Sequence, residues 1–218
     1  MRAFPHARVS EFDELFAYSP LLGGESVIDI PSGGGYIAHR FGGRARVTSL
    51  EIASGFNPAM PLVDPDMLAT FTGYDHAVCL AALHHFEDPF NFLVRLRATL
   101  KPNGTIHLAD VPSGSPLCNF LDDFVGRYNT TGHKGRYLSA DPALYASLGN
   151  VVRCEEAPCP WHFASKTDML AFCSALFGLV DCPLDDLRTA LHDFVGYRED
   201  DFGVHLNWRL MYIDIVNR

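Results

Sequence analysis

Apolar and polar positions switch along the chain between short β-rich runs and runs with helical spacing. The β-rich runs, which predict buried strands, are Ser26 to Ile30, Arg46 to Ile52, Asp75 to Ala81 and Thr105 to Asp110. The runs with apolar residues three or four positions apart, which predict helices, are Val9 to Tyr18, Tyr36 to Phe41 and Asp88 to Leu100. Because strands and helices alternate, we expect an α/β architecture with a mainly parallel sheet and helices on both faces.

Two other parts of the chain have a less regular pattern. Residues 53 to 71 are rich in proline, so we expect only a short strand there, near Pro61 to Val63. Residues 112 to 149 predict short helical segments inserted after the fifth strand. The remaining predicted elements are extended chain from Val151 to Phe163, helices near Thr167 to Phe177 and Leu184 to Val195, and a final strand from Val204 to Val216. We expect these late strands to extend the sheet antiparallel at one edge.

Length and composition indicate a single domain over residues 1–218. The chain has 218 residues, of which 48% are hydrophobic and 20% charged, so it can build a core and is not intrinsically disordered. The net charge of -9 and the scattered basic residues argue against a nucleic-acid partner. No apolar stretch approaches the roughly 18 residues that span a bilayer, and the start of the chain lacks the apolar core of a secretion signal. We therefore expect a soluble, cytoplasmic protein with no membrane partner.

The six cysteines contain no CxxC pair, which indicates reduced thiols rather than a metal or disulfide framework. We predict no metal site from the sequence.

A glycine cluster, Pro31-Ser32-Gly33-Gly34-Gly35, lies directly between the first strand and its helix. Glycines there let a ligand approach the backbone next to the N–H groups of the helix start. Two interpretations are open, because Gly33-x-Gly35-x-x-Ala38 also satisfies the dinucleotide fingerprint, with Glu51 placed to hold a ribose diol. The acid at Asp29 discriminates between the two kinds of ligand. Its carboxylate would repel a pyrophosphate by on the order of 1 to 4 kcal/mol at about 4 Å, whereas it would attract a cationic amine.

From Val27 to Ala38 the sequence resembles the class I S-adenosylmethionine-dependent methyltransferases, whose first motif is an acid followed by alternating glycines after strand one. Here that motif stands as Asp29-Ile30-Pro31-Ser32-Gly33-Gly34-Gly35. The motifs that follow in order are Glu51 at the end of strand two, Asp66-Met67, the fourth-strand run DHAVCLAALHHF from Asp75 to Phe86, and the Leu100 to Gly104 turn before strand five. The resemblance covers roughly residues 20 to 111.

The resemblance implies a Rossmann-like three-layer sandwich with a mainly parallel seven-stranded sheet, an antiparallel edge strand and a helical insert after strand five. Residues 20–111 would bind S-adenosylmethionine, and residues 1–19 and 112–163 would cap the acceptor site. The implied activity is in-line methyl transfer to a small, partly apolar or aromatic molecule. The expected cofactor-binding residues are Asp29, Pro31, Ser32, Gly33, Gly35, Glu51, Ile52, Asp66, Met67, Leu80 and Ala81.

Three acids in this set also have a purely structural interpretation. Glu51 would hold the ribose hydroxyls but could be a surface charge at a strand end. Asp66 and Met67 would meet the adenine edge, yet Asp66 could instead cap a helix. Asp29 could tie the loop by accepting backbone N–H groups. Pro31 stands where the family usually has its first glycine, so the loop has one N–H fewer to offer.

Methyl transfer from a sulfonium needs a base only if the acceptor must lose a proton. His84 and His85 follow the fourth strand at the carboxyl edge of the sheet, where open α/β sheets place their ligands. The candidates for orienting the acceptor or removing a proton are His85, His133 and Tyr128, with His162 as a further rival. Each of them could equally be a hydrogen-bonded structural residue.

Aromatic side chains from three regions are expected to line the acceptor pocket: Phe12, Phe16, Tyr18, Phe120, Phe124, Tyr128, Trp161, His162 and Phe163. Two other functions stay open at this point. One is a non-catalytic, cofactor-binding interaction module of the same fold, and the other is an NAD(P)-dependent oxidoreductase.

Overall fold

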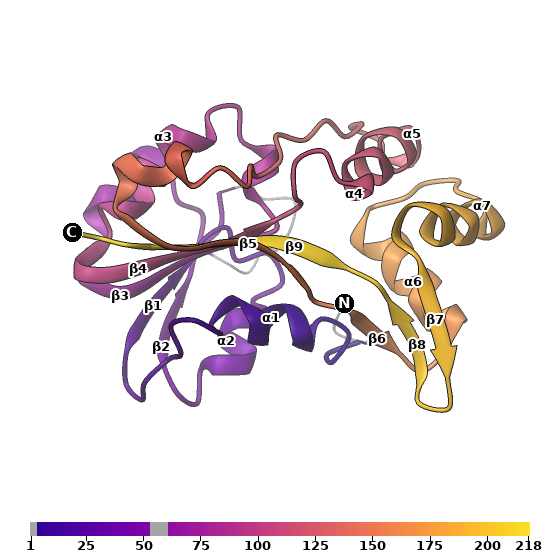
Figure 1. Cartoon of the computed structure of the whole chain (residues 1–218), viewed down its shortest axis with the longest axis horizontal. Coiled ribbons are helices and arrows are strands. Elements are labelled where there is room, and N and C mark those ends of the chain that lie inside the picture. The colour runs from indigo at the N-terminus through magenta and orange to yellow at the C-terminus, as the bar shows by residue number, and fades with distance from the viewer. Residues whose placement is uncertain (1–3, 53–60) are drawn as a thin grey trace.

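A computed structural model describes residues 4–52 and 61–218, and its main feature is a twisted six-stranded sheet (Figure 1). The strands, in the order in which they lie side by side, are β2 (Arg46–Ser49), β1 (Ser26–Asp29), β3 (Tyr74–Leu80), β4 (Leu100–Asp110), β9 (Arg209–Val216) and β5 (Asn150–Pro158). The first four are parallel to one another, and β9 is antiparallel to both of its neighbours. The carboxyl ends of β1, β3 and β4 therefore meet at one edge of the sheet.

The described sheet differs from the expected one in two respects. The expected short strand near Pro61 to Val63 is present only as a single parallel bridge between Glu51 and Leu62, so the main sheet has six strands among the described residues instead of seven. The antiparallel strand, β9, lies one position inside the edge, because β5 pairs with its outer side. The late strands thus extend the sheet through antiparallel pairing, as expected, but the strand that runs against the other five is not the edge strand itself.

Helices cover both faces of the sheet, as expected for a three-layer sandwich. They are α1 (Val9–Leu15) and α2 (Tyr36–Phe41) on one face, and α3 (Pro89–Arg97) with the 3-10 turns η1 (Pro65–Thr70) and η4 (Pro142–Leu148) on the other. Successive side chains of β1 point to opposite faces of the sheet. Val27 therefore packs with Phe12 and Ile37, whereas Ile28 packs with the buried side of α3. None of the helices in residues 4–52 and 61–218 has the length and hydropathy that crossing a bilayer requires.

A second group of elements stands at one end of the molecule, beyond the main sheet (Figure 1). Its members are α4 (Pro116–Asn119), η3 (Phe120–Val125), α5 (Gly126–Tyr128), α6 (Lys166–Leu176), α7 (Leu184–Ala190), η5 (Leu191–Val195), and a small sheet of β6 (Trp161–Phe163), β8 (Gly203–Leu206) and β7 (Tyr197–Asp200). We call this group the cap; it contains elements from the segment 112–163, adds those between Lys166 and Leu206, and does not include residues 1–19.

The two late extended segments each divide between the main sheet and the cap. The first breaks between β5 and β6 at Cys159 and Pro160, and the second between β8 and β9 at Asn207 and Trp208. Pro160 has no N–H to donate to a sheet, and the Trp208 N–H bonds the Leu206 carbonyl in a tight turn at 2.8 Å. The expected unbroken strand from Val204 to Val216 is thus two strands in two sheets.

A buried pair of histidines crosses the main sheet beneath α1. The Nδ1 atom of His76 lies 2.9 Å from Nε2 of His107, whose Nδ1 lies 2.8 Å from the Asp214 carboxylate. On its outer side, His76 Nε2 lies 3.3 Å from Glu25. Burial, and then the neighbouring His107, lower the pKa of His76, although Glu25 and Asp75 act in the opposite direction.

This histidine is expected to make the fold sensitive to acid. Because the pKa of His76 is lowered on folding, the unfolded chain takes up a proton first, so the free energy of unfolding falls as the pH drops below about 6.5. Urea unfolding between pH 7 and pH 5 measures the slope of the free energy of unfolding against pH. One such group can contribute at most about 1.4 kcal/mol per pH unit to this slope. The His76→Gln variant should show a shallower slope; identical slopes would contradict the prediction.

Candidate functional site

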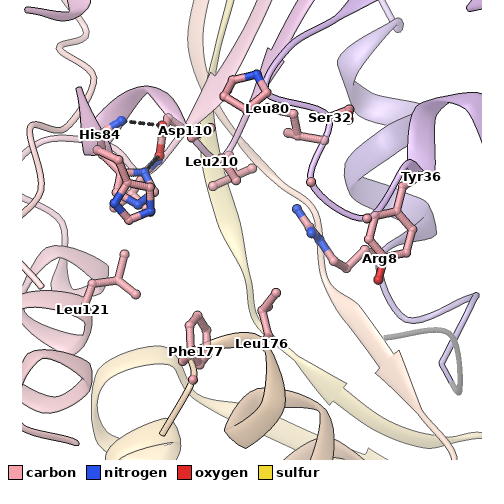
Figure 2. Close-up of a pocket in the computed structure, with 18 of the residues that line it drawn as sticks. Arg8, Ser32, Tyr36, Leu80, His84, Asp110, Leu121, Leu176, Phe177 and Leu210 are labelled. Atoms are coloured by element: carbon pink, nitrogen blue, oxygen red, sulfur yellow. Dashed lines mark hydrogen bonds and ion pairs between the residues drawn. The ribbon is translucent and has the colours of Figure 1, made fainter. Parts of the chain in front are cut away.

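A cavity of about 660 Å³ lies at the carboxyl ends of β1, β3 and β4, between the main sheet and the cap. This is the edge at which open α/β sheets bind ligands, and the volume is in the range of roughly 300–1,000 Å³ typical of small-molecule sites. Figure 2 shows the labelled side chains around the open space: His84 and Asp110 on one side, Arg8 and Tyr36 on the opposite side, and Leu121, Leu176 and Phe177 across from Leu80 and Ser32.

The glycine turn forms part of the cavity wall. Gly33 and Gly35 have φ values of 52° and 73°, in the left-handed region where a side chain would be strained. The Gly35 N–H donates to the Ser32 carbonyl at 2.9 Å, and α2 begins at the next residue. The Ile30–Pro31 peptide bond is cis. The hydroxyl of Ser32 is buried and has no hydrogen-bond partner among the described residues.

Two buried carboxylates accompany this turn. Glu51 accepts the Gly33 N–H at 2.9 Å and the Ile52 N–H at 3.0 Å, one on each oxygen. Asp29 is 1% exposed, and its Oδ2 atom has no partner among the described residues. Burial, and then the negative charge of Glu51, raise the pKa of Asp29 well above its ordinary value. The wall of the cavity is therefore an acidic cradle, defined by Asp29 and Glu51, that suits a cationic ligand.

We expect the charge of Asp29 to lower the stability of the fold at neutral pH and to strengthen the binding of a cationic ligand. Because the folded-state pKa of this acid is raised, its contribution to stability is present at low pH and is lost as the pH rises through that pKa. Asp29→Asn should therefore raise the melting temperature at pH 8 relative to the unchanged protein and weaken the binding of a cationic ligand. A variant that melts lower at pH 8 and binds equally well would contradict the assignment.

Most of the predicted cofactor residues come together in the cavity. Those that line it are Asp29, Pro31, Ser32, Gly33, Glu51, Ile52, Leu80 and Ala81. Gly35 lies behind the wall, where it shapes the turn as the N-cap of α2. Ala81 adopts a φ of 50° directly after β3, with its N–H bonded to the Ala109 carbonyl at 2.7 Å.

Asp66 and Met67 are the predicted cofactor residues that the structure does not bring to the cavity. Both are exposed in η1, and Asp66 forms an ion pair with Arg95 of α3. The residue that caps η1 is Asp64, which accepts the Asp66 N–H at 2.9 Å. The alternative that Asp66 caps a helix was therefore wrong, because Asp64 is the capping residue.

Three histidines gather on one wall of the cavity. His84 and His85 lie in the 3-10 turn η2 (Leu83–His85), and His133 follows α5 in the chain. The ring centroid of His85 is 4.0 Å from that of His84 and 5.2 Å from that of His133. Partial burial, and then the two neighbouring imidazoles, lower the pKa of His85 to about 4. Two of the predicted catalytic candidates, His85 and His133, thus meet in one place.

The other two predicted catalytic candidates lie away from this cavity. The Tyr128 hydroxyl donates to Asp186 at 2.9 Å on the far side of the cap, and that hydrogen bond raises the pKa of Tyr128. His162 is exposed on β6 and packs edge-on against His205. Neither lines the cavity, because the helix and the strand that carry them turn these side chains outward.

The elements predicted to supply an aromatic wall of the acceptor pocket do border the cavity, but most of the aromatic side chains named for it are not the residues that line it. Phe12 and Trp161 line the cavity, as expected. In the helical insert, however, Leu121 and Val125 face the cavity, while Phe120 packs into the core. Leu121 and Val125 lie about one turn apart on the same side of the helix. The predicted residues, Phe120 and Phe124, each precede a cavity residue by one position and therefore lie on a different side of the helix.

The remaining predicted wall residues lie elsewhere: Phe16 is in the core beneath α1, Phe124 and Phe163 pack within the cap, and Tyr18 is exposed.

Arg8 is a cavity residue that the sequence did not single out. Its Nε donates to Glu11 at 2.9 Å, and its guanidinium lies 5.4 Å from the ring centre of Phe12 and 5.6 Å from that of Trp161. It projects toward the open space from the side of Tyr36 (Figure 2). The available signal was an arginine followed three positions later by a glutamate at the start of an apolar helix, which is too common a pattern to indicate a site.

Comparisons by sequence find no relatives: no family model and no curated protein matches the chain. Solved structures, in contrast, match its fold. The YcgJ protein from Bacillus subtilis has 14% sequence identity and a TM-score of 0.64, with 95% of this chain and 98% of that chain covered.

Two further matches are enzymes that act with S-adenosylmethionine or were crystallised with its product. A SAM-dependent methyltransferase from Archaeoglobus fulgidus has 14% identity and a TM-score of 0.57, over 99% of this chain and 97% of that chain. Magnesium protoporphyrin IX methyltransferase from Synechocystis PCC 6803, with bound S-adenosylhomocysteine, has 14% identity and a TM-score of 0.52, over 98% and 84%. The chain therefore has the class I methyltransferase fold.

Proposed function

We propose that the chain is an S-adenosylmethionine-dependent methyltransferase that acts on a small, partly apolar or aromatic acceptor. The observation that carries this proposal is the acidic cradle of Asp29 and Glu51 beside the glycine turn. A buried carboxylate with an unpartnered oxygen favours a ligand that brings positive charge, and S-adenosylmethionine brings an ammonium and a sulfonium. A dinucleotide would instead place its pyrophosphate against the same carboxylates, at a cost in energy.

The cofactor would lie along the wall from β1 to β3. Glu51 is already oriented by two backbone N–H groups, and with respect to the described residues each of its oxygens keeps a lone pair for a ribose hydroxyl. Ile52, Leu80 and Ala81 supply apolar surface next to the nucleoside. We assign the adenine edge to the neighbourhood of Ile52, since Asp66 and Met67 lie outside the cavity.

Arg8 and the cap would complete the site. The Arg8 guanidinium, on the side of α2, is placed to receive the carboxylate of the methionine tail. Leu121, Leu176 and Phe177 form an apolar wall facing the glycine turn, which suits an acceptor that is itself partly apolar. His85 and His133 stand at the same end and would orient a polar group of that acceptor. In-line displacement then depends mainly on alignment and on exclusion of water.

Calorimetric titrations with S-adenosylhomocysteine and with NAD test the cofactor assignment. We expect one molecule of S-adenosylhomocysteine to bind per chain and NAD not to bind; binding of NAD alone would overturn the proposal. Incubation with methyl-labelled S-adenosylmethionine and a panel of phenols, carboxylic acids and amines then tests catalysis. Transfer of label to any of them separates an enzyme from a non-catalytic binding module.

A further inference from the structure

The three cavity histidines come from two separate parts of the chain. One imidazole nitrogen from each of His84, His85 and His133 lies within 4.8 Å of the other two. Imidazoles crowded in this way around one point can present several nitrogen lone pairs to the same volume. This is the arrangement that a metal ion requires.

Two of the histidines are hydrogen-bonded from behind by carboxylates. His84 Nδ1 lies 2.7 Å from Oδ1 of Asp110, and His133 Nδ1 lies 3.1 Å from Oδ1 of Asp122. Such bonds hold the proton on Nδ1 and leave Nε2 as the free lone pair. Carboxylates in this position behind metal-binding histidines orient the rings and raise their basicity.

The carboxylates are themselves held in place. Asp110 is 1% exposed and accepts the Val111 N–H at 2.7 Å and the His84 N–H at 3.1 Å. Asp122 accepts the Gly135 N–H at 2.9 Å and the Tyr137 hydroxyl at 2.6 Å. The dashed lines in Figure 2 trace the connection between His84 and Asp110 at the cavity wall. The support therefore extends from the imidazoles through the carboxylates to the backbone.

Hydrogen bonds to carboxylates hold the rings of His84 and His133, whereas His85 is the most exposed of the three. Among the residues that the structure describes, the His85 ring makes no hydrogen bond, although it lies against two other imidazoles and faces the cavity. A third nitrogen donor aimed at the same point is what a shared ligand would use.

We propose that His84, His85 and His133 bind one divalent transition-metal ion, for which Zn²⁺ is the best match. Three imidazoles with an open fourth position form a site of the kind found in zinc enzymes. Zn–N distances of about 2.0–2.1 Å place neighbouring donor nitrogens about 3.3 Å apart, so the rings would turn inward by about 1 Å on binding. The open position faces the cavity and would take an oxygen or nitrogen of the acceptor. That last role rests on the proposed function, whereas the metal site itself does not.

Zinc titration without cofactor tests this site. Tag-free protein is stripped with a chelator, dialysed, and titrated with Zn²⁺ by calorimetry and with Co²⁺ by visible absorption. We expect one ion per chain with micromolar or tighter affinity and Co²⁺ absorption bands of a four- or five-coordinate centre. His85→Ala and His133→Ala should each weaken binding at least 100-fold. Asp122→Asn should weaken it about 10- to 100-fold through ring orientation alone.

The matched control is His162→Ala, which removes an exposed histidine outside the cavity and should leave the affinity unchanged. Thermal unfolding verifies that each variant is folded, and an alanine variant that is not folded is replaced by the glutamine variant at the same position, His85→Gln or His133→Gln. No uptake of either ion, or uptake that is insensitive to His85 and His133, would overturn the proposal. Metal binding without S-adenosylhomocysteine binding would overturn the proposed function and leave the metal site standing.

Discussion

Replacing Glu51 with alanine is expected to weaken S-adenosylhomocysteine binding about tenfold or more, because a charge-assisted hydrogen bond contributes roughly 1.5 to 3 kcal/mol. The variant loses two contributions at once. It removes the acceptor that we propose for the ribose hydroxyls, and it releases the Gly33 and Ile52 N–H groups that the carboxylate holds. The glycine turn would then be less well ordered for the ligand.

Calorimetric titration of the Glu51 variants separates these contributions. Glu51→Gln keeps one oxygen for a backbone N–H but has no charge, so its affinity should lie between those of the unchanged protein and Glu51→Ala. Glu156→Ala is the matched control, since this exposed glutamate on β5 pairs with Arg209 and does not line the cavity. An unaltered dissociation constant for folded Glu51→Ala would refute the ribose role.

Arg8→Met is expected to lower the free energy of unfolding by about 3 kcal/mol, because it leaves a buried carboxylate without its counter-ion. Glu11 is fully buried, pairs with Arg8, and accepts the Trp161 indole N–H at 2.8 Å. The methionine keeps most of the contact with Phe12 and Trp161, so the loss reports mainly on charge. Urea unfolding at pH 7 measures it.

The double variant Arg8→Met/Glu11→Gln supplies the control. It removes both charges but keeps an amide oxygen for the Trp161 indole, so it should recover most of the lost stability. If the double variant were as unstable as Arg8→Met, packing rather than the unpaired charge would be the cause. If Arg8→Met lost no stability, the ion pair would contribute nothing to the fold.

The core elements of the sheet could be predicted from local pattern. Strands β1 and β3 and the helices α2 and α3 begin and end near their predicted limits, since each is short and bounded by glycine, proline or a capping acid. Strand β4 ends at Asp110 as predicted but begins at Leu100, within the predicted turn, instead of at Thr105. Asp88, for example, caps α3 by accepting the Asn91 N–H at 3.0 Å. The late strands could not be divided correctly, because their apolar pattern continues through the bend at Trp208 from one sheet into the other.

In the candidate site, too, some residues could be predicted from local sequence and others could not. The glycine turn, Asp29 and Glu51 are close in sequence to the strands that position them, so their meeting at the sheet edge followed from a parallel arrangement. Asp66 has the same local signal of an acid near a turn, but α3 supplies Arg95 and holds it outside the cavity. The Asp66-Met67 motif therefore indicated a turn correctly, but it did not determine whether that turn borders the cavity.

By itself, the sequence determined the alternation of strands and helices up to β4 and the two acids that accompany the glycine turn. These properties depend on residues within one or two elements of each other. Only the tertiary structure decided that Leu121 rather than Phe120 faces the cavity, that Arg8 reaches it, and that His133 meets His84 and His85. Such contacts join segments dozens of residues apart, and the packing of the cap on the sheet, which no local pattern encodes, sets which side of each helix turns inward.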